Sequence, residues 1–499
     1  MARKAISGFF KRAKKGLGFT FSGSGLLPDT QRDGYHANRP RLDDDIVNLV
    51  SRHKHRIMLA DGRFIYQSSD TVAGAVHQKS RYVYGRAWRL KYDGEADDFR
   101  DAVHKLFRRI DGVLDVRGAP FSFRKNIRIA SKLLDVDGEF FILLTEAESG
   151  FPRLQFLESH RIGQPKTLPL ESEIEAGPYK GLMIRNGIIY NKQAHPVAYR
   201  LMLDEENFED ISARDMIHVY DPVWFSQGRG IPPISYGLLS FYDLKESRDL
   251  QRIKQKVHSA LTLIESNEQG KTDTGRQAVG GYSPVNRQLQ TELIEGGMIR
   301  YIRNGNKIQP HTANDPSNGQ LEFDKLVESR ALYGINWRRE MVDSSEVGGA
   351  GVRAFQSDIN GIVFDRGDLL LGAWTRAAVY IVAKFEKLRV AGSYDPGWSA
   401  LPSDWFELGF SRPARFTVDD GKYHQEIRED IRAGLLSVPE ACEMRNLDAK
   451  AILSEQADYL DYKKQLAEER GLDPDELGTF SKPGDAPPGA SAPAVDESD

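Results

Sequence analysis

One segment of the chain ends like a phosphate-binding loop. Residues 269–272 read Gln-Gly-Lys-Thr, and in a P-loop the lysine of Gly-Lys-Thr reaches nucleotide phosphates. A P-loop also needs a glycine five residues before that Gly-Lys-Thr glycine, so that the backbone can wrap around the phosphates. Glu265 stands there, on a segment with a helical pattern, and its carboxylate would repel phosphate. We therefore expect no nucleotide site.

Residues 135–139, Asp-Val-Asp-Gly-Glu, carry the carboxylate oxygens that Ca²⁺ prefers. An EF-hand loop requires a third ligand before its glycine and a distant bidentate glutamate, and both are missing here. A turn between a helix and a strand explains the segment better.

Other acid, base and metal-binding patterns are equally incomplete. His53 and His55 are two residues apart among basic neighbours, whereas helical zinc pairs are four apart, so we interpret them as a solvated basic face. Glu139 and Glu158 are candidates for an acid–base pair, but nothing in the sequence links them. No zinc, nucleophile-elbow or dinucleotide-binding motif is present. The sequence predicts no catalytic residue, no metal and no cofactor, so we expect the protein not to be an enzyme.

The composition is that of a soluble globular protein. The chain has 499 residues, 40% of them hydrophobic, which is enough for two to four domains. Its only cysteine, Cys442, excludes an internal disulfide and fits a reducing cytoplasm. No apolar run approaches the roughly 20 residues that cross a bilayer, so no membrane partner is expected.

The charge is nearly balanced. There are 68 basic and 72 acidic residues, a net charge of −4, whereas a protein that wraps or grips DNA carries a basic excess. A conduit for DNA differs, because a basic lumen would hold each phosphate and slow the passage. The charge therefore permits a conduit without requiring one, since −4 is also ordinary for a soluble protein.

The two ends differ from the middle. Residues 1–40 begin with a basic run that has too short an apolar segment for a signal peptide, and we expect a basic arm, with contact to DNA or to a partner as the alternative. Residues 479–499 are rich in proline, glycine, serine and acid, and such a composition predicts a disordered tail.

Hydrophobic periodicity predicts an α+β protein. Helices are expected at 44–55, 69–85, 95–112, 321–341, 423–433, 438–445 and 449–470. Strands are expected at 140–145, 154–157, 187–190, 197–203 and 216–220.

Two longer helices have distinctive patterns. After residue 235, a narrow apolar seam recurs every three or four residues, at Leu250, Ile253, Val257, Leu261 and Ile264. The seam suits a helix packed beside copies of itself, although a helix lying on its own domain is the alternative. A second helix, from about residue 352, has an apolar face formed by Phe355, Ile359, Ile362, Leu369, Leu370, Trp374, Ala377, Ile381, Phe385 and Leu388. Its interior glycines, Gly361, Gly367 and Gly372, predict a kink or close packing.

Between these helices lie two segments of different character. Residues 270–319 are rich in glycine, asparagine and glutamine, and Asn304-Gly-Asn306 predicts a hairpin turn between 297–303 and 307–308. Residues 343–351 are small and polar, as in a flexible loop.

The most informative segment joins the strand at 217–220 to the first long helix. It contains Gln227 and the corner Gly-Arg-Gly-Ile-Pro-Pro over residues 228–233, in which glycine and proline fix a sharp change of direction. This arrangement resembles the signature of the lambda-type portal family of tailed bacteriophages, whose members carry Gln-x-Arg-Gly-Val-Pro before a stem helix. Ile231 replaces the usual valine.

Further blocks extend the resemblance in the family's order. They are a Gly-Glu strand followed by Leu-Gln-x-Leu-Glu within 132–162, a hairpin at 186–199, and the C-terminal segments 416–420, 431–440 and 470–472. Residues 270–319 match no such block.

The resemblance implies a multi-domain portal fold with a wing, a helical stem, a small β-containing clip, a long kinked wing helix and a helical crown. The expected parts are a basic arm (1–40), the α+β wing (41–236), stem helix 1 (237–266), the clip (267–320), stem helix 2 (321–342), a tunnel loop (343–351), the long wing helix (352–390), a wing-to-crown connection (391–420), the crown (421–478) and the tail (479–499).

It also implies where functional residues lie. The tunnel loop would face DNA through Asp343, Ser344, Ser345, Glu346, Gly348, Gly349 and Arg353. The clip would dock the packaging motor through Arg300, Arg303, Asn304 and Lys307. The wing–stem junction would be formed by Gln227, Arg229, Gly230 and Pro232.

The function implied is a ring of twelve copies at one capsid vertex, assembled in the host cytoplasm, through which double-stranded DNA passes without sequence specificity. Its partners would be the terminase large subunit, a head-completion or adaptor protein, and the major capsid and scaffolding proteins. One alternative is a head or tail structural protein without a channel. Another is a nucleic-acid-processing ATPase or nuclease, which an intact P-loop or a carboxylate cluster would have favoured.

Overall fold

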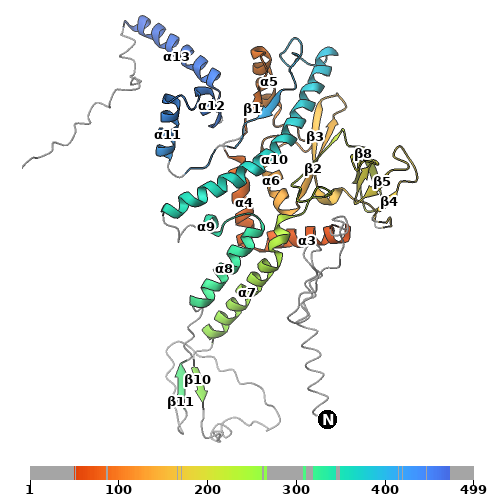
Figure 1. The fold of residues 1–499 in the computed structure, drawn as a ribbon, viewed down its shortest axis with the longest axis vertical. Helices are drawn as coiled ribbons and strands as arrows, with labels where there is room; N and C mark the ends of the chain where they lie inside the picture. The colour runs from red at the N-terminus through yellow and green to blue at the C-terminus, as the bar shows by residue number, and fades with distance from the viewer. Residues whose placement is uncertain are drawn as a thin grey trace, which may run out of the picture.

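The computed structural model describes residues 50, 52–85, 88–165, 167–169, 171–260, 263–266, 307–310, 318–343, 349–413, 415–417, 420–445 and 447–471. These residues form a body of helices and sheets, with two helices projecting from one end and a group of helices at the other (Figure 1). The fold is α+β, as predicted. The expected basic arm, most of the clip and the acidic tail lie outside the described residues.

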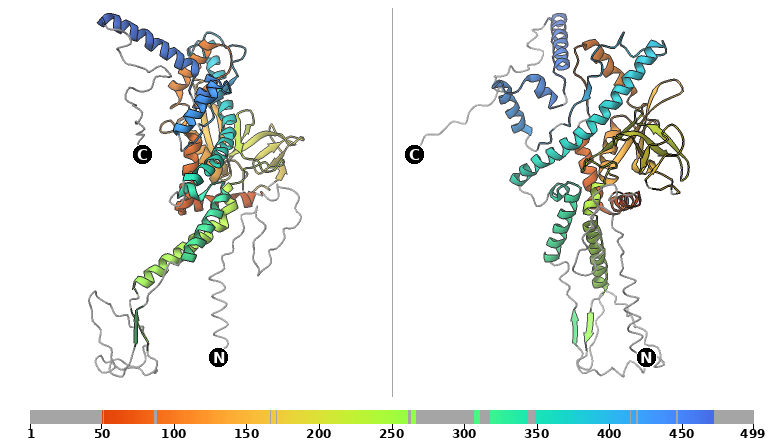
Figure 2. Two further views of the ribbon diagram at one scale, coloured as in Figure 1. Left: turned by 60° about the vertical axis from the view of Figure 1, so that its left-hand side comes forward. Right: turned by 45° about the vertical axis from the view of Figure 1, so that its right-hand side comes forward.

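The longest element among the described residues is α10 (Gly349–Val390), which runs across the body (Figures 1 and 2). Its predicted apolar face is confirmed by the full burial of Ile359, Leu370, Trp374, Ala377, Ile381 and Phe385. The helix is continuous through its three glycines, and only Gly367 is closely packed. A β-carbon there would lie 2.9 Å from Cδ of Pro413. The helix also begins earlier than predicted, so residues 349–351 form its first turn rather than the end of a loop.

In the part of the chain that the structure describes, four helices precede the two larger sheets: α3 (Arg52–Ser68), α4 (Asp70–Tyr84), α5 (Asp97–Ile110) and α6 (Lys125–Val136). The expected helices at 69–85 and 95–112 are α4 and α5. The prediction at 44–55 has the wrong bounds, because α3 starts at Arg52 and continues to Ser68. Its buried residues, His55, Met58, Gly62 and Ile65, do recur every three or four positions, but glycine and histidine conceal the pattern.

A buried ionic link joins α4, α6 and α10. One carboxylate oxygen of Asp135 lies 2.9 Å from Nζ of Lys79 and 2.9 Å from Nη2 of Arg366, and all three residues are buried. One carboxylate oxygen of Asp135 thus pairs with cations from two other helices. This residue, a calcium-ligand candidate by its sequence, therefore has a structural role inside the body.

A three-stranded antiparallel sheet, ordered β3-β2-β9, packs beside α10. Its strands are β3 (Pro152–Glu158), β2 (Glu139–Glu146) and β9 (Met216–Tyr220). The central strand is apolar on both faces: Phe140 and Ile142 enter the main core, whereas Phe141 enters a second core with Leu157. Burial on both sides explains why its sequence is a continuous apolar run.

That second core is shared with an antiparallel sheet of five strands in the order β4-β5-β6-β7-β8. The strands are β4 (Glu171–Glu173), β5 (Met183–Arg185), β6 (Ile188–Tyr190), β7 (Pro196–Met202) and β8 (Phe208–Ser212). The predicted strands at 187–190 and 197–203 are β6 and β7. The other three give little alternation to detect, because β4 and β8 are mostly polar and β5 has only three residues. A separate two-stranded sheet pairs β1 (Leu90–Tyr92) with β12 (Leu408–Phe410).

Two antiparallel helices leave the body together and form what we call the projection. They are α7 (Leu238–Ala260), which follows the 3₁₀ turn η2 (Pro233–Gly237), and α8 (Asn318–Gly334) (Figures 1 and 2). At its tip, β10 (Leu263–Ser266) pairs antiparallel with β11 (Lys307–Pro310).

Two helix predictions are corrected here. The helix expected over 237–266 ends at Ala260, and residues 263–266 are a strand because they pair with residues more than 40 positions away in sequence, which no local pattern reveals. The helix expected over 321–341 ends at Gly334, Asn336 has a left-handed φ of 52°, and a short helix α9 (Arg339–Val342) follows. Residues 297–306 of the expected hairpin lie outside the described residues.

The described residues end with three helices: α11 (Asp420–Arg432), α12 (Val438–Glu443) and α13 (Ala449–Arg470). They match the predicted helices within three residues. Local signals fix their ends: Ser437 and Glu440 form a capping box, Asp448 caps α13, and Gly471 ends it in a left-handed conformation.

Candidate functional site

The four predicted junction residues lie together in the segment between β9 and η2. Gln227 is buried, and its side chain closes the loop that precedes the corner. Its Oε1 accepts a hydrogen bond from the Val223 backbone N–H at 2.8 Å, and its Nε2 donates to the Arg229 carbonyl at 2.8 Å. The Tyr220 hydroxyl donates to the Gln227 carbonyl at 2.8 Å. One amide therefore ties the end of β9 to the corner.

Arg229 is buried and connects four parts of the chain. Its Nε donates to Glu139 at 2.8 Å, and its Nη2 donates to the same carboxylate and to the Ser159 carbonyl. Its Nη1 donates to the carbonyls of Ile162 at 3.0 Å and Asn186 at 2.6 Å. A guanidinium has five N–H donors in a planar fork, and a lysine has three on a single nitrogen. The position therefore specifically suits arginine.

Glu139, the first residue of β2, lies at the centre of this network and is fully buried. Besides Arg229, it accepts hydrogen bonds from the Ser159 hydroxyl at 2.5 Å, the Gly230 N–H at 2.6 Å and Nε2 of His218 at 2.9 Å. Burial favours a raised pKa, but the Arg229 charge and the His218 hydrogen bond outweigh it and hold the Glu139 pKa well below its usual range. The carboxylate is therefore ionised, and both of its oxygens accept hydrogen bonds.

Two histidines border the same carboxylate. His218 comes from β9, and His55 from α3, with its Nε2 3.6 Å from Glu139 Oε1. Burial and the Arg229 charge lower the pKa of His55 to about 4, and burial also lowers the pKa of His218. The expectation that His55 belongs to a solvated basic face is wrong: it is 3% exposed, because helix α3 turns that side toward the body.

The corner itself is held by direct backbone contact. Gly230 packs against Gly138 in the turn between α6 and β2, where a β-carbon on Gly230 would lie 2.4 Å from the Gly138 carbonyl oxygen. Gly138 has a φ of +79°, and a β-carbon there would lie 2.3 Å from the Ile231 carbonyl carbon. Pro232 then caps the start of η2, which leads into α7. The predicted helix-to-strand turn at 135–139 is confirmed, and the corner packs directly against it.

Acidification is expected to destabilise this network. In the unfolded chain His55 takes up a proton near the ordinary histidine pKa of 6.5, whereas the folded protein protonates it only near pH 4. The unfolded state therefore holds more protons in this window, so stability falls as the pH drops from 6.5 toward 4, by about 2 kcal/mol at pH 5.

The measurement is thermal unfolding between pH 7.5 and 5. His55→Gln should make the dependence of the melting temperature on pH shallower, whereas the exposed neighbour variant His53→Gln should leave it unchanged. Equal slopes in the wild type and His55→Gln would contradict the assignment.

A second candidate site is the projection, where polar groups lie between the two helices. Asp324 of α8, only 9% exposed, accepts hydrogen bonds from Ser247 at 3.3 Å and Gln251 at 2.8 Å on α7. One helical turn further along α8, toward the body, Glu328 pairs with Arg248 of α7 at 2.9 Å. Over this stretch the two helices contact each other through polar and charged side chains, whereas nearer the body Phe241 of α7 and Leu332 of α8 are buried in the main core.

Apolar side chains point outward from the same helices. Leu250 is 59% exposed and Ile253 57% exposed on α7, and Phe323 is 62% exposed on α8. Leu321, Leu326 and Tyr333 of α8 are also exposed. The two seam residues therefore do not pack on their own domain, so for them the alternative of a helix lying on its own domain does not hold. A helix pair with polar contacts inside and apolar residues outside has surface for a partner.

The other predicted site residues are only partly described. Asp343 caps α9, Gly349 opens α10 and Arg353 lies in the first turns of α10, whereas Ser344, Ser345, Glu346 and Gly348 lie outside the described residues. Lys307 is the first residue of β11, and Arg300, Arg303 and Asn304 lie outside them. Of the three predicted sets, the junction set is the one that lies wholly within the described residues.

Within the described residues, no group of three or more His, Cys, Asp or Glu side chains is arranged to hold a metal ion. Among the described helices, none combines the length and apolar content of a membrane span. Glu265, expected on a helix, lies in β10, and residues 270–272 of the P-loop-like segment lie outside the described residues.

Sequence reasoning missed the partners of the junction. It offers Glu139 only as half of an acid–base pair with Glu158, but Glu139 binds Arg229, while Glu158 lies 3.0 Å from Arg63. A usable signal is present in the sequence: Glu139 begins an apolar strand, and His218 interrupts another. A polar side chain in a buried strand needs a hydrogen-bonding partner. Each of these two residues therefore predicts that a partner exists, but it does not identify that partner.

Comparison with known proteins agrees with these features. A sequence model of the lambda family of phage portal proteins matches residues 49–333, which is more than half of the chain. A sequence comparison with curated proteins finds no match.

Solved structures give distant similarities. A chain in the neck of an empty gene transfer agent particle, computed with C6 symmetry, is 14% identical with a TM-score of 0.44, covering 79% of this chain and 94% of that one. A chain in the neck of the native particle, computed with C12 symmetry, is 12% identical with a TM-score of 0.43, and the coverage of both chains is the same. An HK97 family phage portal protein from Corynebacterium diphtheriae is 12% identical with a TM-score of 0.28, covering 60% of this chain and 87% of that one. Because the family model matches more than half of the chain, this protein belongs to the lambda family of phage portal proteins.

Proposed function

We propose that copies of this chain assemble into a closed ring that forms a DNA channel at one vertex of a capsid. The observation that carries this proposal is the projection, whose polar contacts lie between its two helices and whose large apolar side chains lie outside. Leu250, Ile253 and Phe323 are each more than half exposed in the single chain. Covering such side chains with another apolar surface is favourable by roughly 1.5 kcal/mol or more each.

A ring covers this surface without any other protein. In a closed ring each copy has two neighbours, so both flanks of every projection are in contact. The projections then line up as parallel helix pairs around one axis. Family membership supports this arrangement, and twelve copies is the number that the resemblance implies.

The junction has a mechanical role in this proposal. Arg229 and Glu139 join β2, η1 (Ser159–Arg161), the β5–β6 turn and the corner, and Gly138 and Gly230 leave no space between corner and body. The direction of α7 is thereby fixed relative to the body. A channel requires this, because an error in the angle would be repeated in every copy and would prevent closure.

Charge and composition are consistent with passage of DNA rather than binding. The net charge of −4 provides no excess of cations to neutralise phosphates, so a duplex would not be held by the chain as a whole. No catalytic step is proposed for the protein; the energy for DNA movement would come from a separate motor.

Negative-stain electron microscopy tests the ring. End-on views of the purified protein should show closed particles with a central opening that admits a DNA duplex, about 20 Å wide, and mass photometry should give one dominant multiple of 56 kDa. Monomers or dimers at all protein and salt concentrations, or rings without an opening, would instead support a structural protein without a channel.

We further propose that the tip of the projection docks the terminase motor. The described pairing of β10 with β11 suggests how to isolate it: residues 267–306 are replaced by a short Gly-Ser linker, which leaves both strands in place. Rings should still form, because the exposed apolar side chains of α7 and α8 are retained. Binding of the terminase large subunit in a pull-down should fall to background. Retained binding would locate the docking surface elsewhere.

The segment from Asp343 to Gly349 is proposed to face the DNA, near the end of α9 and the start of α10. Asp343 and Glu346 would then repel phosphates. The double variant Asp343→Lys, Glu346→Lys is expected to form rings and to slow packaging or alter DNA retention, more at low salt than at high salt. Unchanged packaging and retention at both salt concentrations would contradict this location.

A further inference from the structure

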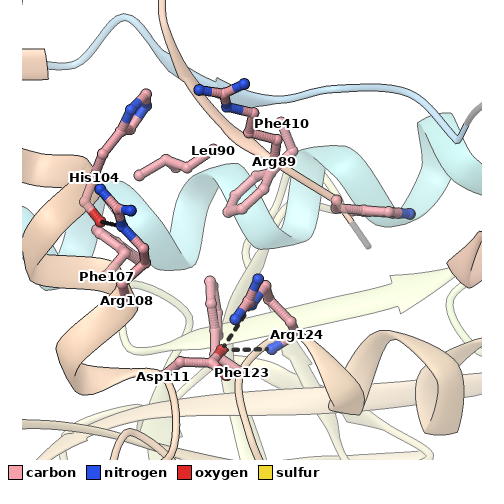
Figure 3. Close-up of a pocket in the computed structure, with 10 residues that line it drawn as sticks. Arg89, Leu90, His104, Phe107, Arg108, Asp111, Phe123, Arg124 and Phe410 are labelled. Carbon is pink, nitrogen blue, oxygen red and sulfur yellow. Dashed lines mark hydrogen bonds and ion pairs between the residues drawn. The ribbon is translucent and has the colours of Figure 1, made fainter. Parts of the chain in front are cut away.

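Away from the junction and the projection, a cavity of about 250 Å³ opens where α5, β1, β12 and the segment before α6 meet (Figure 3). Its floor is apolar and largely aromatic, and consists of the buried side chains of Leu90, Phe107, Phe123 and Phe410. A cavity of this size accommodates one large side chain.

Three arginines surround this apolar floor. Arg89, Arg108 and Arg124 come from three different segments and line the cavity around the aromatic side chains (Figure 3). Two of them form ion pairs with acidic residues: Arg124 Nε is 3.5 Å from Asp111, and Arg89 Nη2 is 3.5 Å from Asp448. The third, Arg108, donates from its Nε to the His104 carbonyl at 3.4 Å. The site is suited to an apolar side chain with carboxylates beside it.

The chain itself carries such a segment after α13. Residues 472–499 contain seven acidic residues and one lysine, and Phe480 is their only aromatic residue. Asp475 and Glu476 precede it, and Asp485 follows it. The segment therefore offers negative charge to the arginines and one aromatic side chain to the apolar floor.

The geometry of α13 allows this segment to return. The helix starts beside the cavity, because its cap Asp448 faces Arg89 and Lys450 pairs with Asp97 of α5 at 3.1 Å. Its 22 residues span about 33 Å. The ten residues from Arg470 to Phe480 span about 33–36 Å when extended, so Phe480 can lie back along α13 and reach its start.

We propose that the acidic segment after α13 docks on this cavity, with Phe480 on the aromatic floor and its acidic neighbours facing the three arginines. The contact is made within one copy or between adjacent copies of a ring. It would fix the position of α13, whose side chains Leu453, Tyr459, Leu460 and Tyr462 are largely exposed in the single chain.

Photocross-linking in the full-length protein tests this contact. p-Benzoylphenylalanine replaces Phe480, the sample is irradiated and digested, and cross-linked peptides are identified by mass spectrometry. Cross-links are expected to peptides that contain residues 88–92, 104–110, 121–124 or 408–412. The same photoreactive residue at Val495 is the matched control and should give few cross-links there. Mixing isotope-labelled and unlabelled chains distinguishes contacts within one copy from contacts between copies.

Charge variants test the arginine rim. Asp475→Asn with Glu476→Gln changes only the segment beyond α13, so it leaves the cavity intact, and it should lower the cross-linking yield by about fivefold or more. Arg108→Glu with Arg124→Glu should lower it at least as much. Cross-links from position 480 to other surfaces, or yields unaffected by either pair of changes, would overturn the proposal.

The result is separable from the proposed channel. Mass photometry on the same samples reports assembly independently of the cross-links. Rings without cavity cross-links would overturn the docking alone. Cavity cross-links within single copies, in a protein that forms no rings, would support the docking and count against the channel.

Discussion

Replacing Arg229 with methionine is expected to lower the free energy of unfolding by about 3–5 kcal/mol, because it leaves the Glu139 carboxylate buried without its ionic partner. Methionine has a similar length, so the loss reflects charge and hydrogen bonding more than volume. The network also loses the donors that bind the carbonyls of Ser159, Ile162 and Asn186. The measurement is urea unfolding at one fixed protein concentration, since assembly adds to apparent stability.

The pH dependence gives this prediction a signature. In the wild type the Glu139 pKa is depressed, so its contribution is present above about pH 4.5 and is lost as the pH falls further. Without Arg229, burial is no longer opposed by that charge, and the carboxyl binds a proton more readily in the folded state. The stability difference between wild type and variant should therefore shrink as the pH falls toward 4.

Two variants serve as controls for Arg229→Met. Adding Glu139→Gln removes the unpaired charge and should recover a large part of the loss, because a neutral amide is much less costly to bury. Arg252→Met on the exposed side of α7 should change stability by no more than about 0.5 kcal/mol. A loss below about 1 kcal/mol in Arg229→Met would show that the junction is not held by this pair.

The second large effect concerns assembly. Leu250→Glu together with Ile253→Glu should abolish rings and leave a folded monomer, because the ring would bury two carboxylates without partners. Both side chains are more than half exposed in the single chain, so the fold of each copy has little reason to change. Mass photometry should show a peak near 56 kDa in place of the ring, with an unchanged circular dichroism spectrum.

Lys192→Glu is the matched control for this pair. It also makes the net charge two units more negative, but it lies in the exposed turn between β6 and β7, away from the projection. It should assemble as the wild type does. Rings of normal size in the Leu250→Glu, Ile253→Glu variant would show that this face of α7 is not an interface, and the proposed arrangement of the projections would fail.

Local sequence patterns determined most elements of the fold. The apolar face of α10 was readable because burial on one side of a helix repeats every 3.6 residues. The ends of α12 and α13 were readable because caps use specific side chains. The β2 and β9 strands were readable as apolar runs, and the corner at 228–233 was readable from glycine and proline. All of these depend on residues close together in the chain.

The tertiary structure alone decided which groups meet. Arg229 was identified as a junction residue, but its partner Glu139 lies 90 positions away, and nothing local links a carboxylate to a given arginine. His55 has the sequence neighbours of a solvated face, but the direction in which α3 packs buries it. Residues 263–266 continue a helical pattern, but pairing with β11 makes them a strand. The seam on α7 was visible in the sequence, yet only the polar contacts between α7 and α8 show that Leu250 and Ile253 face away from the chain's own body. In each case the deciding energy comes from a contact between distant segments, which exists only after the chain has folded.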